Sequence, residues 1–230
     1  MENKTFDFTD SIKKLLSIWL MKKNFLNNNE KKFFFNIGCR YLNNVDTLYS
    51  VNEIILTGKE HLKDDTLVFS IEKNEIEIKN NSNSLKLDLK LFRNILIGMI
   101  DILETMYPLG TVVELKKEFF INHIQIEKVN RLLIIITKRF LYKENEKSYF
   151  PYAGIVYPIG DIKQNEVLHF TSPLIENIVH KGYSDIQDEA YIYFMKKELI
   201  IKNSMHSYSF STKEELEKLA RKQNRKDWNK

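Results

Sequence analysis

Residues 132–141 read LLIIITKRFL, and Leu132–Ile136 is the strongest apolar run of the sequence. A run this long that is rich in β-branched residues predicts a strand buried at the centre of a sheet. It is far too short to cross a bilayer as a helix. The fold of the second half of the chain is therefore expected to form around this strand.

Glycine and proline surround this strand and divide the chain. All four prolines follow residue 107, as do Gly110, Gly154, Gly160 and Gly182. This predicts short strands and turns after Tyr107. Strands are expected at 111–115, 152–157, 167–171 and 178–183, in a small curved antiparallel sheet or SH3-like barrel. A helix is expected from Ser184.

The first half has helical periodicity interrupted by a few strands. Ile12, Leu15, Leu16 and Trp19 share one helical face, and Asn27–Asn29 is expected to end that helix. A second helix is predicted around 31–42, and strands at 66–71, 75–79 and 85–89. The clearest helix runs from Phe92 to Leu103 and has an unbroken apolar stripe.

These patterns predict an α+β protein of three parts. Residues 1–106 form a helical or mixed α+β region, and residues 107–201 form a small antiparallel β domain with a helix at its end. Residues 202–230 form a short helix, with a capping box at Thr212 and Glu215, and a basic tail. The fold and role of the first part remain open at this stage.

Composition narrows the function classes. The chain has 230 residues, 43% hydrophobic, with a net charge of +4. This charge is too small and too dispersed to indicate nucleic acid by itself. The single cysteine, Cys39, excludes an internal disulfide, and a buried, inert thiol is expected. No signal peptide or membrane-spanning run is visible, so a cytoplasmic protein without an integral membrane segment is expected.

The chain lacks the motifs that carry chemistry. It has no glycine-rich phosphate loop, no paired-cysteine metal site and no nucleophile elbow. His169 and His180 fall on neighbouring predicted strands, but nothing near them completes a metal-ligand set. Asp185, Asp188 and Glu189 match the start of a helix, where negative charge is favourable. We therefore expect no catalytic residue, no metal and no cofactor, and interpret the protein as not an enzyme.

A resemblance goes further than these patterns. The segment from Tyr107 to about Ile201 resembles a bacterial family known as domain of unknown function 4176. The resemblance rests on the order and spacing of five motifs: Pro108–Leu115, Leu132–Thr137, Tyr152–Gly160, Phe170–Ile175 and Val179–Asp185. The segment departs from simple members through the extra residues Lys116–Asn130.

The resemblance implies a context rather than a reaction. Family members are typical of Gram-positive bacteria and are often encoded near type VII secretion clusters and their toxin cargo. No family motif is catalytic. The motif residues are interpreted as fold determinants: Gly110, Gly154, Tyr157, Pro158, Gly160, Phe170, Gly182 and Tyr183.

Two functions follow. The first is a non-enzymatic accessory protein of type VII secretion, either an adaptor or chaperone or an immunity-type protein, which binds a secreted protein or toxin encoded in the same gene neighbourhood. The alternative is a nucleic-acid-binding small-barrel protein. Its charge would come from the basic tail and from Arg131, Lys138, Arg139, Lys143 and Lys147. Because Glu144, Glu146, Asp161 and Glu166 interrupt this basic region, only weak binding of nucleic acid is expected. The sequence leaves the binding surface and the oligomeric state open.

Overall fold

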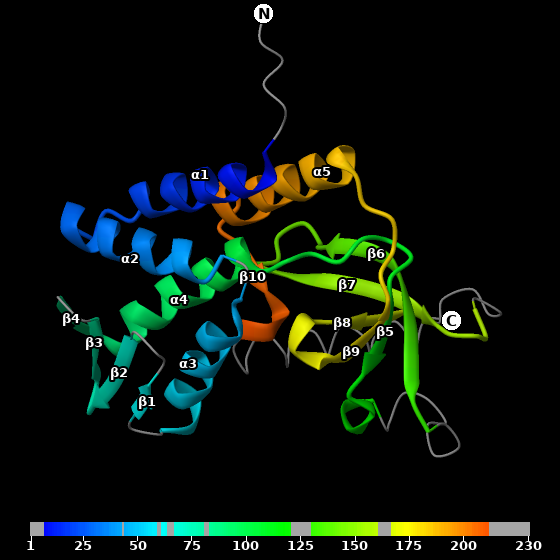
Figure 1. Ribbon diagram of the computed structural model, residues 1–230, viewed down its shortest axis with the longest axis horizontal. Helices are drawn as coiled ribbons and strands as arrows, with labels where there is room; N and C mark the ends of the chain where they lie inside the picture. The colour runs from blue at the N-terminus through cyan, green and yellow to red at the C-terminus, as the bar shows by residue number, and fades with distance from the viewer. Residues whose placement is uncertain are drawn as a thin grey trace, which may run out of the picture. The chain divides into compact units, whose positions relative to one another are not determined.

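The computed structural model describes residues 7–42, 44–58, 61–63, 67–80, 83–120, 130–160 and 167–211 (Figure 1). The chain is α+β and divides into two compact units. The first contains the described residues up to Thr105 together with Glu189–Asn203. The second contains Met106–Asp188 and the described residues after Asn203. The second unit thus begins at Met106, and residues 189–203 return to the first unit.

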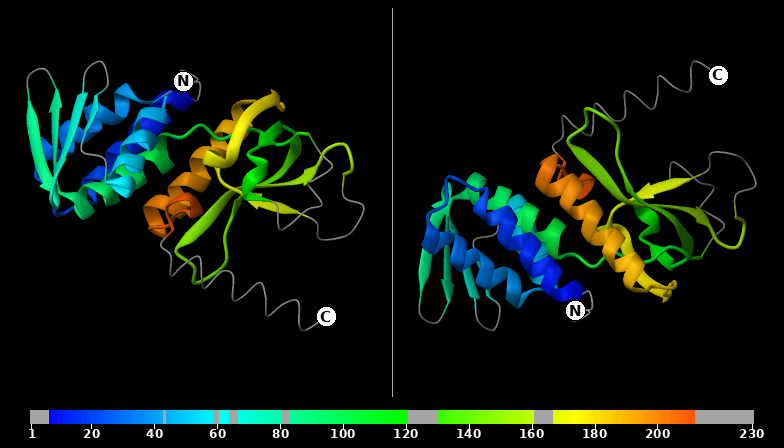
Figure 2. Two further views of the ribbon diagram at one scale, coloured as in Figure 1. Left: turned by 90° about the horizontal axis from the view of Figure 1, so that it is seen from below. Right: turned by 90° about the horizontal axis from the view of Figure 1, so that it is seen from above.

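The first unit combines helices with a four-stranded meander. Its helices are α1 (Phe8–Met21), α2 (Asn28–Arg40), α3 (Asp46–Thr57) and α4 (Leu89–Leu103). Its strands are β1 (His61–Lys63), β2 (Leu67–Glu72), β3 (Glu75–Asn80) and β4 (Ser84–Asp88). They pair antiparallel in the order β1-β2-β3-β4 and lie side by side in Figure 2.

Helix α4 is the centre of this unit. The predicted stripe is confirmed, since Phe92, Ile95, Ile100 and their periodic neighbours are all buried. The Phe92 ring lies 6.2 Å from that of Phe34 on α2 and 6.4 Å from that of Phe69 on β2. One helix thus joins the other helices to the sheet.

Asn27 begins a helix instead of ending one. Its side chain accepts the N–H of Glu30 at 3.0 Å, and the Glu30 carboxylate accepts the N–H of Asn27 at 2.8 Å. This reciprocal capping box starts α2. The prediction that Asn27–Asn29 ends the first helix is wrong, because α1 already ends at Met21.

A helix that begins at Ile186 completes the first unit. It consists of α5 (Ile186–Lys196), which belongs to this unit from Glu189 onward, and a π-helical stretch, η4 (Lys197–Lys202). At their junction, Lys196 is 1% exposed, and its ammonium donates to the carbonyls of Ile102 at 2.7 Å and Glu104 at 2.5 Å. These carbonyls belong to the C-terminal end of α4, where intrahelical partners are missing. Lys196 therefore caps α4 from a distant part of the sequence.

The second unit is built around the predicted central strand. Its strands are β5 (Val112–Leu115), β6 (Leu132–Leu141), β7 (Ser148–Val156), β8 (Leu168–Phe170), β9 (Ile175–His180) and β10 (His206–Ser207). Short 3₁₀ turns occur at η1 (Lys117–Phe119), η3 (Ser172–Leu174) and η5 (Tyr208–Phe210). The strand order is β10-β7-β6-β5-β9, and β8 also pairs with β7.

The expected SH3-like barrel is not observed. All pairings in this sheet are antiparallel except that of β10 with β7, and its two ends do not pair among the described residues. Bulges interrupt the ladder at Thr137 in β6 and at Glu176 and Val179 in β9. A bulged strand bends and twists more strongly at the extra residue, so the bulges account for local curvature of this open sheet.

Three further sequence-based expectations can be placed. The short helix expected from Thr212 and the basic tail lie outside the described residues. Cys39 is half-buried, and desolvation raises the pKa of its thiol although nearby Lys13 opposes the rise. Among the described residues, no helix has both the length and the apolar character needed to cross a bilayer.

The buried ammonium of Lys196 predicts a specific pH dependence. Loss of water lowers its pKa from 10.5 to about 8, although the Glu104 and Asp101 carboxylates oppose this shift. Between pH 8 and pH 10.5 the unfolded chain keeps a proton that the folded chain has released, so stability rises with pH in this window. Relative to Lys196→Met, the wild-type free energy of unfolding should gain about 3 kcal/mol from pH 8 to pH 10.5.

Urea denaturation across this window measures the difference. The exposed Lys202 on η4 supplies a matched control, because Lys202→Met should leave the wild-type pH profile unchanged. If the free energy of unfolding of the wild type and of Lys196→Met changed identically with pH, Lys196 would not have a lowered pKa in the folded protein.

Candidate protein-binding turn

Exposed apolar side chains concentrate near the end of the second unit. The described residues include fourteen exposed large apolar side chains, and six of them fall between Ile178 and Phe194. Four of these six, Ile178, Val179, Tyr183 and Ile186, belong to the second unit. Tyr183 is 82% exposed, the highest value of the fourteen. We call residues 181–185 the Tyr183 turn.

The chain before Tyr183 is fixed by a close approach of backbones. The N–H of Gly182 donates to Oγ1 of Thr111 at 3.0 Å, and this hydroxyl donates to the carbonyl of Pro108 at 2.7 Å. A Cβ atom at Gly182 would lie 2.2 Å from the Leu109 carbonyl oxygen. Any side chain at position 182 would therefore displace the turn from the loop before β5.

The chain after Tyr183 is fixed by a buried ion pair. Nη2 of Arg139 on β6 lies 2.5 Å from Oδ1 of Asp188, and these side chains are 4% and 16% exposed. Ser184 donates to the same carboxylate at 3.1 Å. Asp185 accepts the N–H groups of Gln187 and Asp188, both at 3.0 Å, at the start of α5. The exposed Tyr183 is thus held between two anchors.

A polar cluster holds strand β9 to its neighbour in the sheet, β5. Glu114 on β5 accepts a bidentate contact from Arg131 at 2.9 and 2.7 Å and a third bond from Asn177 of β9 at 3.2 Å. These hydrogen bonds, chiefly those from Arg131, lower the pKa of Glu114 to about 2. The bulges at Glu176 and Val179 change the alternation of side chains, and Ile178 and Val179 are both exposed.

The motif glycines have two different roles. Gly110 and Gly160 have positive φ angles of 79° and 75°, as expected for turns. Gly154 lies inside β7, where a Cβ would be 2.2 Å from the carbonyl oxygen of Ile135. Gly154 and Gly182 are therefore explained by close backbone approach, which the sequence alone does not indicate.

The other motif residues separate into core and surface. Phe170 is buried and stacks on Tyr152 at 5.5 Å. Tyr157 is exposed and precedes Pro158 through a cis peptide bond. Tyr157 and Tyr183 were predicted as fold determinants, but neither ring lies in the core.

The structure also places the two histidines and the arginines that the sequence analysis singled out. His169 on β8 and His180 on β9 lie on opposite sides of β7, β6 and β5. The described residues contain no group of three metal-ligating side chains. Arg139 was expected on a basic face, but it is buried against Asp188, and Arg131 pairs with Glu114. Asp161 and Glu166 lie outside the described residues.

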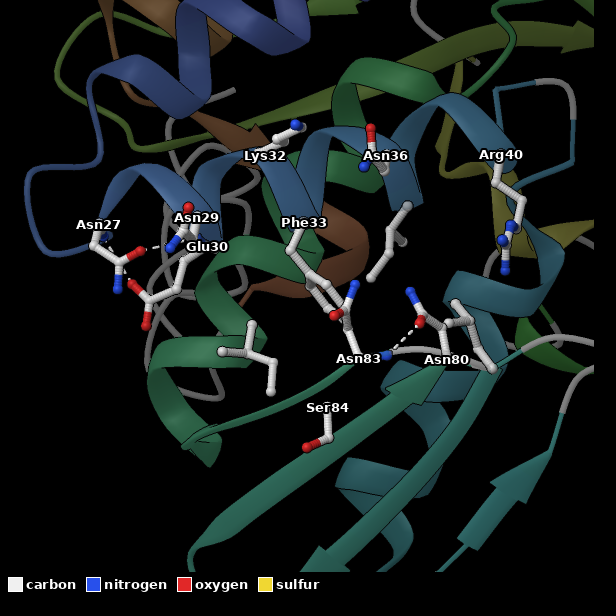
Figure 3. A pocket seen from close by; sticks show the side chains of 13 residues that line it. Asn27, Asn29, Glu30, Lys32, Phe33, Asn36, Arg40, Asn80, Asn83 and Ser84 are labelled. Atoms are coloured by element: carbon white, nitrogen blue, oxygen red, sulfur yellow. Dashed lines mark hydrogen bonds between the residues drawn. The ribbon is translucent and has the colours of Figure 1, made fainter.

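The first unit has a separate surface pocket of about 470 Å³. In Figure 3, Phe33 points from α2 toward Asn80 and Asn83, while Arg40 lies near one end and Asn27 near the other. Five asparagines contribute to its lining, and each carboxamide can both donate and accept hydrogen bonds.

Comparison with known proteins identifies one family. Residues 106–191 match the family described as Domain of unknown function (DUF4176), which confirms the resemblance inferred from the five motifs. The match covers less than half of the chain and contains the Tyr183 turn. No curated protein and no solved structure matches the chain.

Substitution of Gly182 and of Gly110 by alanine should lower the free energy of unfolding by different amounts. In Gly182→Ala the new methyl meets backbone atoms of Leu109 and Thr111, which cannot rotate away. Overpacking of this kind costs about 1–3 kcal/mol. Gly110→Ala meets no atom within 4 Å and carries only the strain of positive φ, about 1 kcal/mol.

Urea denaturation of both variants tests the assignment. Gly182→Ala is expected to be the more destabilised of the two. If Gly110→Ala lost more stability, the close approach would not be what fixes the turn.

Proposed function

From the family match and the Tyr183 turn, we propose that this protein is a non-enzymatic, cytoplasmic accessory protein of type VII secretion. It binds a protein encoded in the same gene neighbourhood, either a secreted substrate or a toxin. The observation that carries the proposal is the exposed, doubly anchored Tyr183, with the exposed Ile178, Val179 and Ile186 close to it in the sequence.

Exposure of these residues supports binding because they are the residue types used at protein interfaces. Aromatic side chains are enriched at interface centres and dominate binding energies there. A ring exposed to 82% gains little from folding, so its apolar surface remains available for burial against a partner.

The anchors support the proposal through pre-organisation. Gly182 is fixed by Thr111, and Asp188 is fixed by Arg139. A segment already held in its binding conformation loses less conformational entropy when the partner binds. A partner that buries Tyr183 therefore gains affinity from the anchors without contacting them.

The secretion context rests on the family resemblance, and it gives two forms of the function. An adaptor or chaperone holds a secreted protein before export, whereas an immunity-type protein neutralises a toxin. Both forms need a stable complex with an apolar centre, which should persist where exposed charges are screened.

Co-purification from the native host tests the proposal. Tagged protein washed at about 0.3 M salt should retain a protein encoded by a neighbouring gene, because apolar contacts persist when charges are screened. Tyr183→Ser should weaken the complex at least tenfold, as expected for an aromatic anchor. Tyr142→Ser is the matched control, because Tyr142 is also exposed but lies in the connection after β6.

Calorimetry on the purified pair gives the affinities. Retention of the partner by Tyr183→Ser at wild-type affinity would remove the Tyr183 turn from the interface. Absence of any neighbour-encoded protein would contradict the accessory role itself. Co-expression with the toxin then separates the two forms, because only an immunity-type protein restores growth.

A further inference from the structure

Three aromatic rings are stacked in a row, which we call the aromatic ladder, at the edge of the second unit's sheet opposite β9. The rings of Tyr208 and Phe150 are stacked with centroids 4.3 Å apart and an interplanar angle of 25°. The rings of Phe150 and His169 are stacked at 5.2 Å and 29°. Phe150 is therefore in the middle, and His169 is a terminal ring whose residue is exposed.

Two lysines lie near the His169 end of this ladder. Lys138, Ala153 and His169 are direct cross-strand neighbours on β6, β7 and β8. Side chains directly opposite one another lie on the same face of a sheet, so only the small Ala153 separates Lys138 from His169. Lys143, in the connection after β6, also acts electrostatically on His169.

This environment favours a neutral imidazole. Partial burial lowers the pKa of His169, and the positive charges of Lys138 and Lys143 lower it further. At neutral pH the terminal ring is therefore an uncharged, flat π-surface beside two ammonium groups. Glu146 accepts the Tyr208 hydroxyl at 2.8 Å, which places its charge at the opposite end of the ladder.

We propose that the His169 end of the ladder is a binding site for single-stranded nucleic acid. A base stacks on the outer face of His169 and extends the ladder to four rings, while Lys138 and Lys143 contact the flanking phosphates. Single strands are recognised in this way, through stacking on aromatic side chains combined with cationic contacts to the backbone.

The ring geometry favours this ligand over an acidic protein segment. A carboxylate would use the lysines but would leave the face of His169 without a planar partner. A base with its phosphate uses both features at once. With only two phosphate contacts the site is weak and salt-sensitive, and it is independent of the Tyr183 turn, which lies beside β9 on the opposite edge.

Fluorescence anisotropy with a labelled twelve-nucleotide oligothymidylate tests the site in the full-length protein. His169→Ala should reduce affinity about tenfold or more, the usual effect of removing a stacking ring. His169→Phe should preserve affinity, because it keeps a ring without the imidazole nitrogens. His180→Ala is the matched control at the opposite edge of the sheet and should bind like the wild type.

Salt dependence separates stacking from charge. Lys138→Glu combined with Lys143→Glu should reduce the slope of log affinity against log salt by about 1.4, since each phosphate contact on a single strand contributes about 0.7. Lys117→Glu, an exposed lysine on η1, should leave this slope unchanged.

Three results would overturn the proposal. They are oligothymidylate binding that is unchanged in His169→Ala, a salt slope that is unchanged in the double lysine variant, and equal displacement by polyglutamate of the same charge. The last result would reduce the site to a charged patch. Circular dichroism of each variant establishes that its fold is intact before binding is compared.

Discussion

The first unit depends on one buried charge. Lys196 lies on the part of α5 that follows residues 106–188 of the second unit, and its ammonium donates to the carbonyls at the end of α4. The partial negative charge at the C-terminal end of the helix favours a cation there, whereas loss of water disfavours the charge and lowers the pKa of Lys196. Asp101 and Glu104 are buried nearby, and Tyr49 of α3 donates to Glu104 at 2.7 Å. One side chain therefore holds α3, α4 and α5 in a single polar network.

This capping explains the interrupted order of the units along the chain. Residues 106–188 of the second unit lie in the sequence between α4 and Lys196, which caps it, so residues 189–203 must return to complete the first unit. Removing one partner from a buried network leaves charge without compensation, which costs several kcal/mol. We therefore expect that a chain ending at Thr105 would have a destabilised first unit, because the end of α4 would lose its cap.

Local periodicity predicted much of the fold, and non-local contacts account for most of what it missed. The apolar stripe of α4, the β2–β3 hairpin and the central strand β6 follow from sequence spacing alone. Helix α3 was not predicted, although its buried Leu48, Val51 and Ile54 lie at helical spacing. Barrel closure depends on how the two edges of a sheet meet, which local sequence spacing does not indicate. The role of Lys196 was equally hidden, because a lysine within a helix usually indicates an exposed face.

At the candidate site, too, the sequence predicted which residues matter but not which contacts explain them. Gly182 and Tyr183 were recognised as a motif, but the reason for the glycine is the Leu109 carbonyl, about seventy residues earlier. Arg139 was counted as a surface cation, whereas the fold buries it to fix Asp188. Once Arg139 and Arg131 are used internally, the basic residues still available in this region are lysines near the aromatic ladder.

The two edges of the second sheet therefore differ in physical character. The edge at β9 presents apolar side chains beside an anchored turn, and the Arg131–Glu114 and Arg139–Asp188 pairs lie in the same unit. The edge at β8 presents a neutral ring beside ammonium groups. Apolar burial is little affected by ionic strength, whereas phosphate contacts weaken steeply as salt rises. At physiological salt the first kind of contact keeps its strength, which is why the Tyr183 turn, rather than the ladder, is the better candidate for the main function of the protein.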